Sequence, residues 1–212
     1  WENAMPSTLE YPAFLGSEIA ASPAGRAAFH VLPVPLEKTV SYGGGTRLGP
    51  AAILAASWQL ELWDGRSRPA DLGIHTCPPV DCAPDPEQVI ENIAQATQAI
   101  VAAGAMPVVL GGEHTVTFGV IEGMLRAGVD NLGVVQIDAH ADLRDAYEGD
   151  PLSHASVMRR IVDRGVPLYQ LGIRAFCEEE RAAREHYGVR FQDAEELVVR
   201  GLSAIALPDD FP

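Results

Sequence analysis

Positive charge is scarce in this sequence. Its 212 residues include 15 Lys and Arg against 29 Asp and Glu, a formal net charge of −14, and Lys38 is the single lysine. Proteins that bind nucleic acids or anionic membrane surfaces rely on clustered Lys and Arg side chains. We therefore expect neither a nucleic-acid partner nor a membrane partner.

Cysteines and long apolar runs are also few. The longest apolar stretch, residues 99–110, is interrupted by Gly104 and Pro107 and is too short to cross a bilayer. Residues 1–16 show no secretory signal. An odd number of cysteines without metal-finger spacing indicates free thiols in a reducing compartment, so we expect a cytoplasmic protein; they are Cys77, Cys82 and Cys177.

Short apolar runs alternate with helical patterns along the chain. Continuous apolar strands separated by helices are typical of a parallel sheet that is buried on both faces. The pattern predicts an α/β fold of three αβα layers, with a doubly wound parallel sheet, in a single domain over residues 1–212. The expected strands cover 28–34, 106–110, 132–138, 168–171 and 189–191, and the expected helices cover 49–62, 86–104, 117–127, 156–164, 178–187 and 194–200.

Side chains of the metal-ligand type follow two of these strands. Gly111-Gly112-Glu113-His114 follows the expected strand 106–110, and Asp138-Ala139-His140-Ala141-Asp142 comes at the end of the expected strand 132–138. Ligands bind at the carboxyl ends of strands in such sheets. Alternate residues of an extended segment point to one side, so Asp138, His140 and Asp142 are expected to converge, with His114 nearby. Either motif alone also fits ordinary turn chemistry, but together they favour a metal site. Oxygen and imidazole donors without thiolate suit Mn²⁺, Fe²⁺, Co²⁺ or Zn²⁺, and the oxygen-rich balance favours Mn²⁺ over Zn²⁺.

Other polar residues receive simpler interpretations. His154 precedes a helix and follows an acidic loop, where a histidine can carry protons. We expect structural roles for His30, His75 and His186, and solvated helix faces at Arg159-Arg160 and Glu178–Glu180. The glycines at 43–45 do not continue into a dinucleotide-binding pattern, because the required third glycine falls at Leu48; they predict a loop lying over a nearby site.

In order and spacing, these motifs resemble the ureohydrolases, the arginase and agmatinase superfamily. Ser153-His154-Ala155, Gly172-Ile173-Arg174 and the segment 43–50 extend the resemblance over nearly the whole chain. It implies an arginase-like fold and two Mn²⁺ ions. His114 and Asp142 would bind the first ion, Asp138 would bridge both, and His140 would bind the second. Asp142 and His154 would take part in catalysis, and His154 would also contact the substrate.

The resemblance also implies a reaction, the hydrolysis of a small cationic guanidino compound. The acidic loop 143–153 lacks the Asn and Ser/Thr pattern with which arginases hold an α-carboxylate. Agmatine, cleaved to putrescine and urea in polyamine biosynthesis, is therefore the preferred substrate, and arginase or guanidinobutyrase activity stays open. So do a non-catalytic ureohydrolase-like subunit and an amide hydrolase of the related deacetylase fold. The family implies a homo-oligomer, a trimer or a hexamer.

One family motif, a second Asp-x-Asp pair, is missing. Asp209 and Asp210 are adjacent, so they would project to opposite sides of an extended chain and cannot replace it. With only Asp138 and Asp142, a two-metal site would keep a positive charge and repel a guanidinium. We therefore expect that the sequence is a fragment, incomplete at its C-terminus, and that the fragment alone need not be active.

Overall fold

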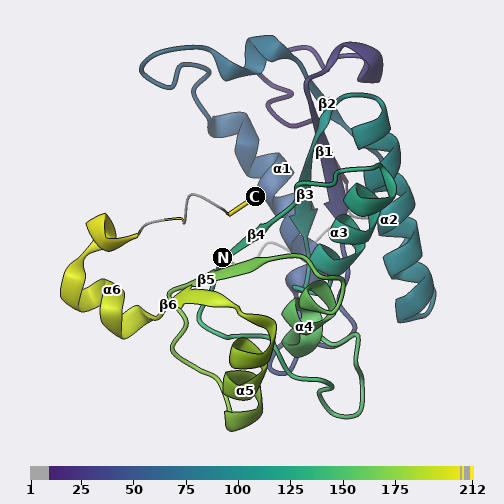
Figure 1. Cartoon of the computed structure of the whole chain (residues 1–212). Helices are drawn as coiled ribbons and strands as arrows, with labels where there is room; N and C mark the ends of the chain where they lie inside the picture. Colours follow the sequence, from purple (N-terminus) through teal and green to yellow (C-terminus); the bar gives the residue numbers. More distant parts are fainter. Residues whose placement is uncertain (1–9, 206, 208–210) are drawn as a thin grey trace. The chain divides into compact units, whose positions relative to one another are not determined.

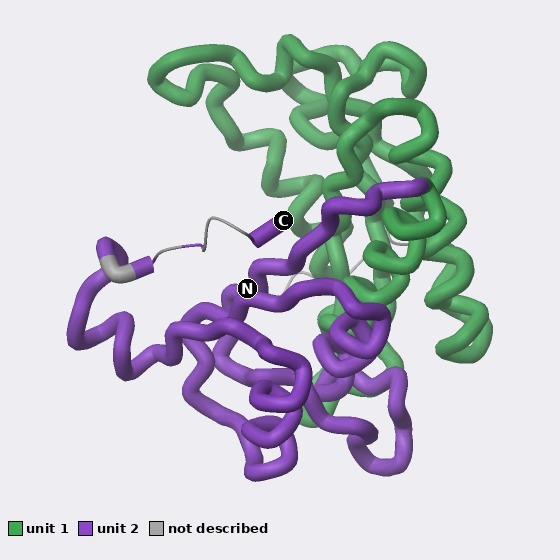
Figure 2. Tube along the Cα trace, viewed as in Figure 1, with its two compact units in different colours: residues 1–127 green, residues 128–212 purple. Residues whose placement is uncertain are grey.

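The computed structural model describes residues 10–205, 207 and 211–212 (Figure 1). The chain forms two compact units, residues 1–127 and residues 128–212, which Figure 2 distinguishes by colour. That residues 1–212 make a single domain stays a prediction. Asp209 and Asp210, which we expected not to supply the missing aspartate pair, lie outside the described residues.

The first unit is built on a parallel sheet with the strand order β2-β1-β3. The central strand β1 pairs with both neighbours, so that Val31 lies opposite Thr76 of β2 and Val108 of β3. Its strands are β1 (Phe29–Val34), β2 (Ile74–Thr76) and β3 (Met106–Gly111), and its helices are α1 (Gly49–Ala56), α2 (Pro86–Ala102) and α3 (Val116–Arg126). Short 3₁₀ helices cover Ala24–Arg26, Thr46–Leu48, Ser57–Gln59 and Pro69–Leu72.

Helix α2 shows how the sequence builds the core of the first unit. Asp85 caps the helix, because its carboxylate accepts a hydrogen bond of 2.9 Å from the Gln88 N–H. Val89, Ile93 and Ile100 recur at helical spacing and are buried. The close packing of α3 against α2 requires glycine, because a Cβ at Gly123 would lie 2.5 Å from the Ala94 carbonyl oxygen.

The second unit contains another parallel sheet, with the strand order β4-β5-β6. Its fully buried side chains include Leu143, Met158, Ile161 and Ile173. The strands are β4 (Val134–Ile137), β5 (Leu168–Leu171) and β6 (Arg190–Gln192), and the helices are α4 (Val157–Val162), α5 (Glu178–Tyr187) and α6 (Ala194–Arg200). The 3₁₀ helices cover His154–Ser156 and Leu202–Ala204.

Alternating helices and parallel strands confirm the predicted α/β class, with two local differences. Strand β2 was not predicted, because its three residues include two polar side chains and do not form an apolar run. The helix expected over 49–62 ends at Ala56, and the Ser57 hydroxyl donates a hydrogen bond of 2.6 Å to the Leu54 carbonyl. Such a side-chain bond competes with the helix backbone. None of the described helices combines the length and apolar composition that crossing a bilayer requires.

Candidate metal site

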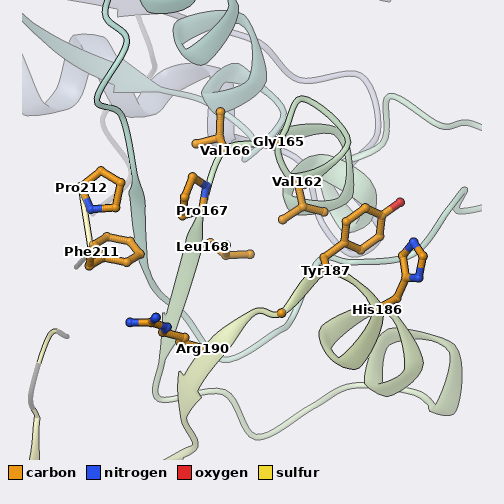
Figure 3. Close-up of a pocket in the computed structure, with 11 residues that line it drawn as sticks. Val162, Gly165, Val166, Pro167, Leu168, His186, Tyr187, Arg190, Phe211 and Pro212 are labelled. Carbon is orange, nitrogen blue, oxygen red and sulfur yellow. The ribbon is translucent and has the colours of Figure 1, made fainter. Parts of the chain in front are cut away.

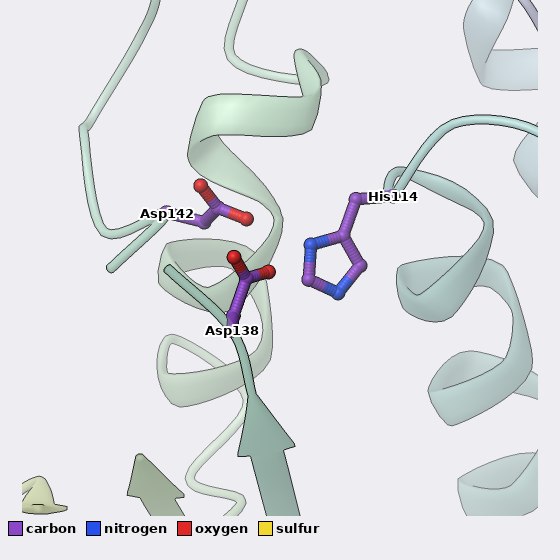
Figure 4. A group of neighbouring side chains, drawn as sticks. All are labelled: His114, Asp138 and Asp142. Carbon is purple, nitrogen blue, oxygen red and sulfur yellow. The ribbon is translucent and has the colours of Figure 1, made fainter. Parts of the chain in front are cut away.

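The two aspartates predicted as metal ligands lie together after β4. A carboxylate oxygen of Asp138 is within 4.8 Å of one of Asp142, and Figure 4 labels both side chains. Asp142 is 6% exposed, whereas the Asp138 side chain is 24% exposed. The geometric reason we gave for their approach is wrong, because the segment is not extended throughout. The chain bends at Ala139, and Asp142 takes the left-handed conformation with φ 53°.

Two buried glutamines in neighbouring strands form hydrogen bonds to Asp138 and to the backbone that follows it. Gln136 of β4 and Gln170 of β5 lie opposite each other. The Gln136 amide donates a hydrogen bond of 3.1 Å to the His140 carbonyl and approaches Asp138 Oδ2 at 3.4 Å. The Gln170 amide in turn donates to Gln136 Oε1 at 2.6 Å and to the Ala141 carbonyl at 2.7 Å. These bonds hold the segment that carries both aspartates.

A buried arginine anchors the far end of this network. Arg184 of α5 is 3% exposed, and its Nε donates to Gln170 Oε1 at 2.8 Å. Its two terminal nitrogens donate to the Asp193 carboxylate at 3.1 and 3.0 Å, and the guanidinium lies over the rings of Phe176 and Phe191. A guanidinium that has left water needs such complete pairing. Sequence reasoning missed this network, although a glutamine inside each of two apolar strands was a usable signal.

Glu180 fixes the backbone next to Asp142. It is 4% exposed, and its two oxygens accept hydrogen bonds from the Leu143 N–H at 3.1 Å and the Cys177 N–H at 2.8 Å. The prediction that residues 178–180 form a solvated helix face is therefore wrong for Glu180. The Asp142 carbonyl also accepts bonds from the first turn of α4, at Met158 and Arg159. The left-handed Asp142 is thus fixed from two sides.

His140 lies beside Asp138 but is exposed. Its side chain is 69% exposed, and its Nδ1 is 3.7 Å from Asp138 Oδ1. Its backbone N–H donates a hydrogen bond of 2.9 Å to the same oxygen. That bond orients the Asp138 carboxylate, and the role of His140 as a ligand of a second ion stays a prediction.

His154 opens the short 3₁₀ helix before α4. Ser153 caps this helix, since its hydroxyl accepts a bond of 3.1 Å from the Ala155 N–H. The His154 ring meets the Tyr147 ring edge to face, with centroids 5.8 Å apart, and the Arg144 guanidinium lies 5.3 Å from the Tyr147 centroid. The imidazole is therefore packed against an aromatic neighbour, and its role as a proton carrier stays a prediction.

In the first unit, His114 lies on a tight turn between β3 and α3, where Figure 4 draws its side chain. The Gly112 N–H donates to the Val34 carbonyl and the Glu113 N–H to the Leu36 carbonyl, both at 2.9 Å. A Cβ on Gly112 would lie 2.0 Å from the Leu36 oxygen, so this turn requires glycine. This close approach is the physical reason for the glycine before the Glu113-His114 pair.

Two carboxylates tie the glycine-rich loop to the His114 turn. Glu113 is 4% exposed and accepts hydrogen bonds from the Lys38 N–H and from the N–H and hydroxyl of Thr39. Glu37 accepts bonds from the Gly45 N–H at 2.6 Å and the Arg47 N–H at 3.0 Å. The bond from the Arg47 N–H is the main reason why the pKa of Glu37 is lowered. The segment that contains the predicted loop is therefore held at residues 38–39 by Glu113 and at residues 45–47 by Glu37. Sequence reasoning gave neither carboxylate this role.

A pocket of about 510 Å³ in the second unit is a less suitable site (Figure 3). It lies at the start of β5, away from the carboxyl strand end that carries Asp138. The Tyr187 hydroxyl beside it donates to Asp163 at 2.5 Å and accepts from Arg159 at 3.0 Å. The side chains of Arg159 and Arg160 are only 21% and 19% exposed, so the prediction of a solvated face is wrong for this pair.

Comparisons with known proteins place the chain in a family. The model of the arginase family matches residues 27–207, and the chain belongs to that family. N(1)-aminopropylagmatine ureohydrolase of Synechocystis sp. is 43% identical over 175 residues, which are 79% of this chain and 57% of the relative. Agmatinase of Bacillus anthracis is 32% identical over 178 residues, 80% of this chain and 57% of the relative.

A solved structure gives the corresponding result for the fold. The crystal structure of agmatine ureohydrolase of Thermoplasma volcanium superimposes with a TM-score of 0.79 at 28% identity, covering 93% of this chain and 66% of that one. The arginase-like three-layer fold and the resemblance to the ureohydrolases are thereby confirmed. The chain spans 57% of the length of the two curated relatives just described.

Proposed function

We propose that the protein is a ureohydrolase that releases urea from a cationic guanidino compound. The observation that carries the proposal is the pair of carboxylates after β4, Asp138 and Asp142, which lie within 4.8 Å of each other. A buried hydrogen-bond network from Gln136 to Arg184 holds them. Membership of the arginase family supports a hydrolytic role for that pair.

The donor set fits a divalent metal pair, for which we propose Mn²⁺. Asp138 and Asp142 supply oxygen atoms, and we propose His114 and His140 as the imidazole ligands. Carboxylate-rich sites without thiolate suit Mn²⁺, and hydrogen bonds that orient ligating carboxylates are a regular feature of metal sites. A bound metal pair lowers the pKa of water, which supplies a nucleophile near neutral pH.

Three residues of the chain would have further roles in the reaction. Asp138 and Asp142 would hold the metal pair and offset part of the positive charge that a cationic guanidinium meets there. His154, packed against Tyr147, would deliver the proton that the leaving amine needs. We retain Asp142 and His154 as the candidate catalytic residues and His154 as the candidate substrate contact.

For the substrate, we propose an agmatine-type amine, with agmatine and N(1)-aminopropylagmatine as the leading compounds. The names of the relatives favour these two, and the net charge of −14 favours attraction of a polycation. Arginine and guanidinobutyrate are the alternatives. A role in polyamine biosynthesis, a cytoplasmic location and a trimer or hexamer stay predictions.

The test is urea release from these four compounds by the intact protein in the presence of Mn²⁺. We expect turnover of an agmatine-type amine that Asp138→Asn abolishes. The matched control is Asp130→Asn, because Asp130 is an exposed aspartate of the same unit. Absence of urea from all four compounds, in a protein that binds Mn²⁺, would instead favour a non-catalytic ureohydrolase-like subunit.

A further inference from the structure

Two histidines face each other in the sheet of the first unit, apart from the His114 turn. His30 of β1 pairs in register with His75 of β2, and their ring centroids are 5.1 Å apart. Both rings line a cavity of about 840 Å³, together with Cys77 and several side chains of α2, among them Ala96 and Ala99. His30 lies near the amino end of β1, whereas His114 follows the carboxyl end of β3.

Hydrogen bonds to backbone carbonyls fix the tautomer of each ring. His30 Nε2 lies 3.0 Å from the Ala24 carbonyl oxygen, and His75 Nδ1 lies 3.1 Å from the Ser22 carbonyl oxygen. A carbonyl oxygen can only accept, so these two nitrogens carry the protons. His30 Nδ1 and His75 Nε2 therefore keep their lone pairs. A histidine that binds a metal commonly donates its other N–H to a backbone carbonyl in this way.

Cys77 adds a sulfur donor to the same wall of the cavity. It follows His75 by two residues, and its N–H donates to the Val31 carbonyl at 2.8 Å, so the pairing with β1 continues to this residue. Residues two apart on a strand share a face, and both line the cavity. The thiol is free and half-buried, and burial raises its pKa. Without a metal ion the sulfur is therefore protonated at neutral pH.

We propose that His30, His75 and Cys77 form a second metal site, for a single thiophilic cation such as Zn²⁺. Two imidazoles and one thiolate make a donor set that suits zinc and leaves a fourth position open toward the cavity. Binding releases the Cys77 proton to solvent, and the sulfur–metal bond forms in its place.

Closing the site requires movement of the Cys77 side chain. In the described part of the chain, the donor atoms of His30, His75 and Cys77 do not all lie within 4.8 Å of one another. Rotation about the Cys77 Cα–Cβ bond leaves both imidazole–carbonyl hydrogen bonds intact, and the open cavity provides room for it. The backbone pairing of β1 with residues 74–77 already brings the three residues to one face. This site is independent of the proposed ureohydrolase activity.

Cobalt titration tests the site, because Co²⁺ bound to thiolate gives a sulfur-to-metal charge-transfer absorption that oxygen and imidazole ligands do not give. We expect titration with Co²⁺ to produce this band in the wild-type chain, with an intensity that saturates at one thiolate-bound ion per chain, and Zn²⁺ to displace it. Cys77→Ser should abolish the band. His75→Gln should weaken cobalt binding on the order of 100-fold. Replacing a residue that only hydrogen-bonds to a metal ligand already costs up to about that factor in metal affinity, and His75 would be a ligand itself.

Cys82→Ser is the matched control, since Cys82 is also a free, half-buried thiol. This variant should keep the band, and circular dichroism should show that all three variants are folded. A wild-type protein without the band would overturn the proposal, as would a band that survives Cys77→Ser or disappears in Cys82→Ser.

Discussion

Replacing Gly112 by alanine should destabilise the turn that carries His114. The added Cβ would lie 2.0 Å from the Leu36 carbonyl oxygen and 2.9 Å from the Leu36 carbon and nitrogen. These atoms belong to the backbone, so no side-chain rotation relieves the clash, and the turn must move. Its two hydrogen bonds, from the Gly112 N–H to Val34 and from the Glu113 N–H to Leu36, would weaken with it.

The size of the effect follows from the clash and from the two weakened hydrogen bonds. Overpacking costs about 1–3 kcal/mol, and each hydrogen bond contributes about 0.5–1.5 kcal/mol. We therefore expect Gly112→Ala to lower the free energy of unfolding by about 2–6 kcal/mol, measured by urea denaturation with an unchanged slope. The control is Gly25→Ala, because a Cβ at Gly25 meets no atom within 4 Å. It should change stability by about 0.5 kcal/mol at most, and equal urea midpoints for the two variants would contradict a backbone clash at residue 112.

Further predictions concern the two polar networks. Gln170→Leu removes the partner of the Gln136 oxygen and of the buried Arg184 Nε, while the bonds from Arg184 to Asp193 remain. Urea denaturation should show a loss of about 3 kcal/mol, because a donor of a buried charged group is left without its partner, and a loss below about 1 kcal/mol would contradict the network's role. Glu37 has a lowered pKa, mainly through the backbone N–H of Arg47, so its stabilisation is present at neutral pH and is lost as the pH falls through that lowered pKa. The NMR shift of the Gly45 amide should follow this titration in the wild type and be flat in Glu37→Gln; a titration that persists in the variant would exclude Glu37 as its source.

Periodicity predicted the elements that bury apolar residues. Helix α2 and strands β1, β3 and β5 lie within a residue or two of their expected bounds. Strand β2 was missed because a three-residue edge strand has too few side chains to show a pattern. The helix from residue 49 ended early because the Ser57 hydroxyl bonds to the Leu54 carbonyl, a local choice that apolar periodicity does not reveal.

The candidate ligands could be named from the sequence, but their supports could not. Asp138 and Asp142 stood out as polar residues after a strand. Glu180 and Arg184 lie in a helix whose composition is that of an ordinary solvated helix. Only the tertiary structure shows that these two side chains are buried. Alternation also gave the wrong reason for the approach of the aspartates, because a left-handed residue, Asp142, is not visible as such in the sequence.

We propose that the carboxylates after β4 belong to a metal site. A Mn²⁺ titration followed by electron paramagnetic resonance tests it directly, with the wild-type chain, Asp138→Asn and Asp130→Asn in parallel. Mn²⁺ should bind to the wild type and to Asp130→Asn, and its binding should be strongly weakened in Asp138→Asn. Equal Mn²⁺ affinity in all three proteins would contradict the assignment of a metal site to these carboxylates.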